Sequence, residues 1–286
     1  MAEQAMSRRI AVNGIEMAYE EHGSGARPFV LVHGFTGSRR DFTPRAAELA
    51  AQGRVVLPDL RGHGESTNTG SAAGYSFDQL VLDLFAFLDA LGIAQCDLLG
   101  HSMGGMVALR AVLAQPRRFA SLVLMDTSAR APADLAREPI EVAARIAREA
   151  GMVPLATILR ARASSPEAGR TDADRRLEAE WGDRYWIDWR FPNYHAMDPF
   201  AFGALGAAML DQLPLAARLG EIRCPTLVLV GSGDSGFRSA ADELATAIPG
   251  ARLAVIPDAG HQPQLENPAA WLAALRDHLA RARESV

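Results

Sequence analysis

Short runs of apolar residues alternate along the chain with longer segments in which apolar residues recur every three or four positions. The short runs are typical of strands buried on both faces, whereas the longer segments are typical of helices with one apolar face. The predicted strands are residues 29–32, 55–57, 96–99, 122–125, 226–230 and 253–256. The predicted helices are residues 41–51, 77–91, 103–114, 240–247 and 269–280. This alternation predicts an α/β protein whose mostly parallel sheet is covered by helices on both faces.

Two segments depart from this alternation. Near the N-terminus, Asn13-Gly14 separates two short apolar runs, and this dipeptide favours a tight β-hairpin. Residues 130–215 contain no clear buried strand; they are rich in Ala, Arg and Glu and are interrupted by prolines, so we expect several short helices there. We therefore predict that this segment is a helical cap inserted between two strands of one core, formed by residues 1–129 and 216–286.

Composition narrows the classes of partner. The chain has 286 residues, a net charge of −5 and 49% hydrophobic residues, which argues against a nucleic-acid partner and against an anionic membrane surface. Residues 1–9 lack the apolar core of a secretory signal, and no apolar run approaches the length of a membrane span. Two cysteines, Cys96 and Cys224, suggest a reducing compartment without disulfides. We therefore expect a cytoplasmic protein that acts on a small molecule, in an oligomeric state that the sequence leaves open.

The segment Gly100-His101-Ser102-Met103-Gly104 joins a predicted strand to a predicted helix. Glycines on both sides of the serine allow a sharp turn that exposes its hydroxyl group. The helix that follows directs its N-terminal N–H groups toward that oxygen. Because a serine hydroxyl is a weak nucleophile until a base takes its proton, the pattern predicts a histidine and a carboxylate further along the chain.

Candidates for both groups follow later strands. His261 lies in a loop with glycine and proline after the last predicted strand, and Asp234 follows the strand before it. Parallel strands end at the same edge of a sheet, so we expect His261 to act as general base and Asp234 to orient it. Asp126, which ends another predicted strand, is the alternative acid, and a helix N-cap is the alternative role for Asp234.

A glycine-bearing loop, His33-Gly34-Phe35-Thr36-Gly37, follows the first predicted buried strand. Such a loop can direct a main-chain N–H toward the negative oxygen of a tetrahedral intermediate. We expect the N–H groups of Phe35 and Met103 to be these donors and His33 to be structural. A tight turn without any ligand is the alternative.

Other polar segments are interpreted as structural. In the loop of residues 59–66, we expect the polar side chains of Asp59 and His63 to satisfy backbone groups rather than to catalyse. The charges of residues 41–45 and 145–149 are interpreted as solvated helix faces. The histidines lack metal-ligand spacing, and no glycine motif for a nucleotide follows the first strands, so we expect no metal and no cofactor.

Aromatic residues gather in the predicted cap. They lie within nine positions of one another: Trp181, Tyr185, Trp186 and Trp189. Such a group can line an apolar pocket for an acyl or alcohol moiety, or it can pack the cap onto the core. The sequence does not decide between these roles.

Together these segments resemble the α/β-hydrolase superfamily, in the branch with a helical cap. The matching elements are an oxyanion loop at His33-Gly34-Phe35, a D-x-R-G-x-G-x-S element at residues 59–66, a nucleophile elbow at Gly100–Gly105, an acid loop at Gly231-x-x-Asp234 and a histidine loop at Gly260-His261. The resemblance implies a catalytic triad of Ser102, Asp234 and His261. Where relatives commonly carry a proline shortly after the acid, this chain has Ser235-Gly236-Phe237, which keeps Asp126 as an alternative acid.

The resemblance implies a serine hydrolase that cleaves a small-to-medium carboxylic ester, thioester or lactone. A serine at the elbow separates the chain from haloalkane dehalogenases and epoxide hydrolases, which carry aspartate there. Three alternatives stay open because a fold does not fix a substrate. They are a cofactor-free perhydrolase or haloperoxidase, a carbon–carbon bond hydrolase on the same triad, and a non-catalytic receptor that keeps only the pocket.

Overall fold

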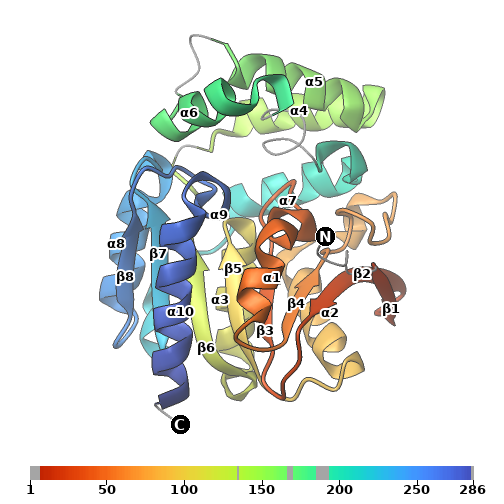
Figure 1. Cartoon of the computed structure of the whole chain (residues 1–286). Helices are drawn as coiled ribbons and strands as arrows, with labels where there is room; N and C mark the ends of the chain where they lie inside the picture. The colour runs from red at the N-terminus through yellow and green to blue at the C-terminus, as the bar shows by residue number, and fades with distance from the viewer. Residues whose placement is uncertain (1–6, 134, 166–169, 185–192, 285–286) are drawn as a thin grey trace.

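The structure is a computed structural model that describes residues 7–133, 135–165, 170–184 and 193–284 (Figure 1). In these residues eight strands form one sheet in the order β1-β2-β4-β3-β5-β6-β7-β8. The strands are β1 (Arg8–Val12), β2 (Ile15–His22), β3 (Phe29–Val32), β4 (Val55–Pro58), β5 (Cys96–His101), β6 (Phe119–Met125), β7 (Thr226–Gly231) and β8 (Arg252–Ile256). Strands β3 to β8 are parallel, and β1 and β2 form the predicted antiparallel hairpin.

Helices cover both faces of the sheet, as the alternation predicts. The helices are α1 (Ala46–Ala50), α2 (Phe77–Ala90), α3 (Met103–Ala114), α4 (Arg137–Ala150), α5 (Met152–Ala163), α6 (Asp172–Trp181), α7 (Pro199–Asp211), α8 (Ser235–Ala247), α9 (Pro263–Glu266) and α10 (Pro268–Glu284). One apolar layer joins α1 and α10 to the sheet, and a second layer joins α2, α3 and α8 to its other face. The predicted α/β architecture, a mostly parallel sheet with helices on both faces, is confirmed.

Two predicted elements differ from the structure. The predicted helix of residues 41–51 consists of 3-10 turns at Arg39–Asp41 and Thr43–Arg45 followed by the short α1. Pro44 lies in the second turn and has no N–H to donate back, which limits a regular helix. The predicted buried strand near residue 253 is β8, which lies at the edge of the sheet in the described residues, and its side chains Leu253 and Val255 are exposed.

Helices α4, α5, α6 and α7 lie between β6 and β7 in the chain, and Figure 1 shows α4, α5 and α6 beyond one end of the sheet with α7 beneath them. Asp198 fixes the start of α7. Its Oδ1 accepts from the N–H of Phe200 at 2.8 Å, and its Oδ2 accepts from the hydroxyl of Tyr75 at 2.5 Å. Because Tyr75 belongs to the segment between β4 and α2, this contact fastens α7 to the layer around the sheet.

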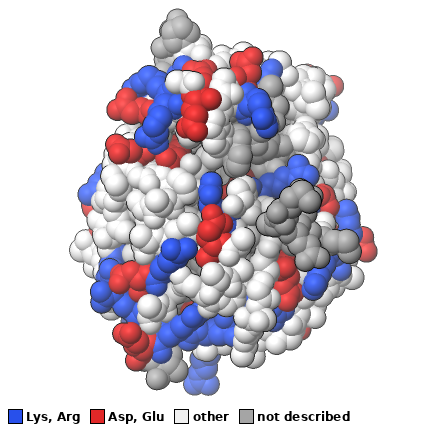
Figure 2. Space-filling view, viewed as in Figure 1, with Lys and Arg blue, Asp and Glu red and all other residues white. Residues whose placement is uncertain are grey.

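The surface adds two observations. On the face drawn in Figure 2, acidic and basic side chains are interspersed over the molecule rather than gathered by sign. Within the described ranges, every helix is too short or too polar to cross a lipid bilayer.

Candidate active site

Ser102 occupies the turn between β5 and α3, in the strand–turn–helix arrangement that the sequence predicts. Its backbone has φ 53° and ψ −119°, in the region that residues with a β-carbon rarely adopt. Two hydrogen bonds hold this conformation: the Ser102 N–H donates to the carbonyl of Met125 at 2.9 Å, and the Thr127 hydroxyl donates to the Ser102 carbonyl at 2.6 Å. The turn is therefore fixed against the end of β6.

The glycines of the elbow allow close packing. A β-carbon at Gly100 would collide with the backbone of Gly104, and one at Gly104 would collide with the carbonyl oxygens of Val32 and His33. The start of α3 therefore lies directly against the carboxyl ends of β3 and β5, beside the glycine-bearing loop.

His261 and Asp234 are in contact. The Nδ1 atom of His261 lies 2.7 Å from Oδ2 of Asp234, and a proton on Nδ1 leaves Nε2 as the basic nitrogen. The imidazole ring is also stacked against the ring of Phe237, with centroids 5.0 Å apart. Asp234 is the N-cap residue of α8, but its side chain makes no capping hydrogen bond. Of the two roles predicted for Asp234, its geometry supports orienting His261 rather than capping α8.

The environment of Asp234 favours its charged form. Burial raises the pKa of this carboxyl group, but the hydrogen bond and the charge of His261, with smaller contributions from Asp126 and His101, together outweigh burial. The net effect lowers the pKa of Asp234 below its ordinary value. The group that faces His261 is therefore a carboxylate at neutral pH.

The alternative acid, Asp126, lies behind Asp234. Its Oδ1 accepts from the N–H of Gly231 at 2.9 Å, and burial followed by the charge of Asp234 raises its pKa well above the ordinary value. Oxygen atoms of the two carboxyl groups and a ring nitrogen of His261 lie within 4.8 Å of one another, a spacing that a metal ion could also span. Because Nδ1 of His261 already contacts Asp234, we interpret this part of the cluster as a hydrogen-bonded pair with Asp126 beside it.

Ser102 and His261 line one cavity of about 300 Å³. The lining of this cavity is partly apolar and partly polar. The apolar lining includes Phe35, Pro132, Leu135, Met209 and Phe237, and the polar lining includes Thr36, Asp41, Asn193, Tyr194 and Gln262. The interpretation of Asp41 as part of a solvated helix face is wrong. It lines the cavity and accepts from the side-chain amide of Asn193 at 2.8 Å, because the helix expected there is a 3-10 turn beside the loop.

The two expected oxyanion donors belong to segments that meet at Ser102, the loop after β3 and the start of α3. Phe35 lines the cavity, and Met103 is the first residue of α3. Neither main-chain N–H donates to an acceptor in the described part of the chain. His33 is structural in its contacts: its Nδ1 bonds the carbonyl of Gly34 at 2.8 Å and its Nε2 accepts from the N–H of Leu60 at 3.0 Å. Burial lowers the pKa of His33 to about 4, so this link is neutral.

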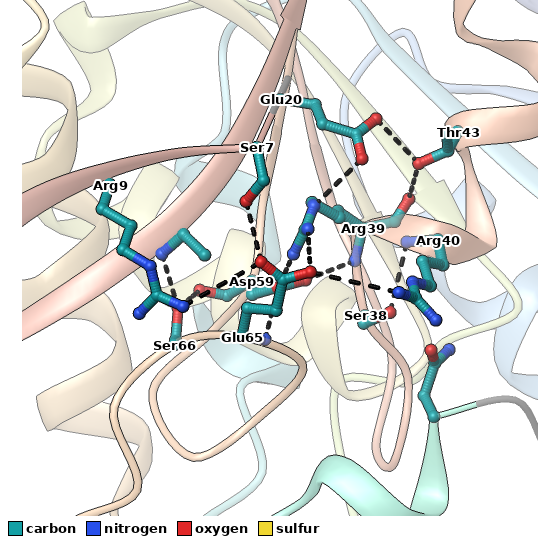
Figure 3. A network of polar contacts seen from close by, with 12 residues as sticks. Ser7, Arg9, Glu20, Ser38, Arg39, Arg40, Thr43, Asp59, Glu65 and Ser66 are labelled. Carbon is teal, nitrogen blue, oxygen red and sulfur yellow. Dashed lines mark hydrogen bonds and ion pairs between the residues drawn. The ribbon is translucent and has the colours of Figure 1, made fainter. Parts of the chain in front are cut away.

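Behind this loop, a buried cluster of charges surrounds Arg39 (Figure 3). The guanidinium group donates to Glu20 on β2 at 3.0 Å, to Asp59 after β4, and to Glu65 at 2.6 Å. Asp59 also accepts from the main-chain N–H groups of Arg39 and Glu65. These bonds match the prediction that the polar residues of segment 59–66 stabilise the loop from within. They also fasten the turn that follows Phe35 to two strands.

The predicted aromatic patch has no member among the described lining residues of the cavity. Trp181 packs beside Leu177 and Leu265, so it contributes to packing between α6 and α9. Tyr185, Trp186 and Trp189 lie outside the described residues. The lining that sequence reasoning missed falls into two groups. Gln262 and Phe237 lie within three residues of a predicted catalytic residue, a proximity that could have identified them, whereas Leu135, Asn193 and Met209 carry no such signal.

Comparisons with known proteins agree on one fold. A sequence model described as alpha/beta hydrolase fold matches residues 27–268. The 3-hydroxybutyrate-oligomer hydrolase of Cupriavidus necator is 30% identical over 274 residues, which cover 88% of this chain and 89% of that protein. A solved thermophilic esterase from Thermogutta terrifontis has a TM-score of 0.81 and 30% identity, covering 97% of this chain and 99% of its own. The solved enol-lactonase from Burkholderia xenovorans LB400 has a TM-score of 0.81 and 27% identity, covering 96% and 100%. One further curated relative is matched over 110 residues, which span 29% of its length.

Proposed function

Because the chain belongs to the alpha/beta hydrolase family, we propose that it is a serine hydrolase that cleaves a small-to-medium carboxylic ester, thioester or lactone through an acyl-enzyme on Ser102. One observation carries the proposal. Ser102 lines the same cavity as His261, and Nδ1 of His261 lies 2.7 Å from Oδ2 of Asp234. This arrangement supports a nucleophile, a base and a group that orients the base at one edge of the sheet.

In the first half of the reaction, Oγ of Ser102 attacks the carbonyl carbon of the substrate while Nε2 of His261 takes the hydroxyl proton. The carboxylate of Asp234 holds the imidazole in the correct tautomer and stabilises the imidazolium that forms. The carbonyl oxygen becomes an oxyanion and is stabilised by the N–H groups of Phe35 and Met103. The imidazolium then gives its proton to the leaving oxygen or sulfur atom, which leaves the acyl group on Ser102.

In the second half, a water molecule replaces the alcohol or thiol. His261 takes one proton from this water, and the hydroxide attacks the acyl carbon. The second tetrahedral intermediate collapses, the proton on His261 returns to Oγ of Ser102, and the carboxylic acid departs. Every step uses side chains and main-chain groups of this protein.

The cavity supports a substrate of moderate size. Its volume of about 300 Å³ and its apolar lining are suited to a short acyl chain, whereas Asp41, Asn193 and Gln262 offer polar contacts. We assign residues 130–215 to a cap that supplies Pro132, Leu135, Asn193, Tyr194 and Met209 to this lining. The enzyme would thus select its substrates largely through the inserted helices.

The proposal is tested with Ser102→Ala. We expect hydrolysis of p-nitrophenyl butyrate to fall by at least about 10³-fold, and labelling by a fluorophosphonate probe to disappear. Ser71→Ala is the matched control, because Ser71 is exposed and outside the cavity. Equal ester hydrolysis by wild type and Ser102→Ala would refute the assignment. Lactones, and acetate with peroxide and bromide, assayed on the same variants would identify the bond type and any peracid formation.

A further inference from the structure

A buried carboxyl group, that of Asp126, and a mostly buried one, that of Asp234, meet at the carboxyl ends of β6 and β7. The strands pair with Met125 opposite Leu229, which brings the residue after β6 next to the loop after β7. Asp126 is only 1% exposed, and its main-chain N–H donates to the carbonyl of Leu229 at 2.9 Å. Its Oδ1 accepts from Gly231, the last residue of β7. The side chain is therefore held by backbone groups on the neighbouring strand.

The second oxygen of Asp126 lacks a donor. Within the described residues, no N–H or O–H group reaches this buried Oδ2 atom, and its neighbour is the carboxyl group of Asp234. Two adjacent carboxylates in a buried site repel each other strongly, so the pair is stable only when one of them holds a proton. A proton on Oδ2 of Asp126 would turn the unsatisfied acceptor into a donor toward Asp234.

The other groups around the pair decide which carboxyl group holds the proton. Asp234 faces His261, whose hydrogen bond favours the carboxylate form. Asp126 instead faces Asp234 and the nearby Glu266, and both charges disfavour a second carboxylate. His101 is a further ionisable neighbour of Asp234, but burial lowers its pKa to about 3 and it is neutral. The negative charge therefore belongs on Asp234 and the proton on Asp126.

Building on the proposed function, we propose that Asp126 is a positioning residue whose protonated carboxyl group donates a hydrogen bond to Asp234. The bond would hold the Asp234 carboxylate in place against His261 and limit the pair to one negative charge. A second charge would stabilise the imidazolium further and slow the transfer of its proton to the leaving group. Asp126 is absent from the cavity lining, so it acts on the reaction through Asp234 alone.

Two substitutions separate this role from a general structural one. Asp126→Asn preserves both contacts, because its amide oxygen can accept from Gly231 and its amide nitrogen can donate to Asp234. Asparagine also tolerates the φ of 46° at this position. Asp126→Ala removes both contacts. Kinetics with p-nitrophenyl butyrate across a range of pH, and infrared difference spectra of wild type against Asp126→Asn, are the measurements.

We expect Asp126→Asn to keep kcat within about threefold and to leave the acid limb of kcat/KM where it is in wild type, because a neutral group replaces a neutral group. Its spectrum at neutral pH should lack one carbonyl band of a protonated carboxyl group. Asp126→Ala should lower kcat by about 10- to 100-fold with KM unchanged, which is the effect of losing a hydrogen bond to a charged group.

Three results would overturn the proposal. They are an acid limb that moves to lower pH in Asp126→Asn, an infrared difference without a protonated carboxyl band, and a wild-type kcat in Asp126→Ala. If Asp126→Ala does not fold, the asparagine variant and its spectrum still decide. Fluorophosphonate labelling of Ser102 is measured separately, so failure here is distinguishable from failure of the serine hydrolase assignment.

Discussion

Replacing Arg39 by Met should destabilise the protein far more than the same replacement at its neighbour Arg40. The side chain of Arg39 is 4% exposed and is bonded to three carboxylates, two of which, Glu20 and Asp59, are themselves buried. Methionine fills a similar volume but leaves those charges without their cation. Breaking a buried ion pair from one side costs about 3–5 kcal/mol, and we expect the free energy of unfolding to fall by that amount.

Arg40 is the matched control. Its side chain is 60% exposed and approaches Glu65 at 4.0 Å, a contact that solvent screens, so Arg40→Met should cost less than about 1 kcal/mol. Urea titrations at pH 7, followed by circular dichroism, measure both variants against wild type. The slope of the unfolding free energy against urea should be unchanged.

A double variant tests the cause. If the cost of Arg39→Met arises from stranded charges, adding Asp59→Asn should recover part of the lost stability rather than add to the loss. Additive losses, or an Arg39→Met variant within about 1 kcal/mol of Arg40→Met, would refute the reasoning.

Three further predictions concern the site and its support. Asp234→Asn should lower kcat by about 10³- to 10⁴-fold because His261 loses its tautomer and its counter-charge, and a rate near wild type in ester assays would contradict this. Asp126→Asn should raise stability at pH 7 but not at pH 4. In the folded wild type Asp126 keeps a proton that it releases above pH ~4 in the unfolded chain, so wild-type stability falls by about 1.4 kcal/mol per pH unit until the folded carboxyl group ionises. Equal melting temperatures of the two proteins at pH 7 would contradict this prediction. Gly104→Ala should lower the free energy of unfolding by about 1–3 kcal/mol, because the added β-carbon meets main-chain oxygens. Gly220→Ala, with open space around it, should leave stability unchanged in the same thermal unfolding assay.

Much of the fold follows from apolar patterning alone. The run Phe29–Val32 is β3 with the same bounds, and the Asn13-Gly14 turn joins β1 to β2 with both residues at positive φ. These elements are predictable because their signals are local: a continuous apolar run and a dipeptide that tolerates left-handed backbone. The order of strands in the sheet is set by packing between distant segments and leaves no such local signal.

The candidate site was predictable where a residue with suitable catalytic chemistry also follows a predicted strand. Ser102, Asp234 and His261 each follow a strand, and parallel strands end together. The contact between Asp126 and Asp234 was not predictable. Two acids that follow neighbouring strands are alternatives for the role of orienting His261 until the distance between them is known. The cavity lining was also missed at Met209 and Leu135, since apolar residues on inserted helices have the same pattern whether they face a core or a ligand.

The strained turn at Ser102 lowers the stability of the folded protein, yet the proposed activity needs it. A residue held at such a backbone angle typically costs about 1–3 kcal/mol, and relaxing it would move the hydroxyl group away from its proposed base, His261. Natural selection for higher thermal stability would therefore leave the turn at Ser102 unchanged. It would act on remote positions instead, such as the exposed strand β8 or the outer faces of helices, where substitutions do not disturb turnover.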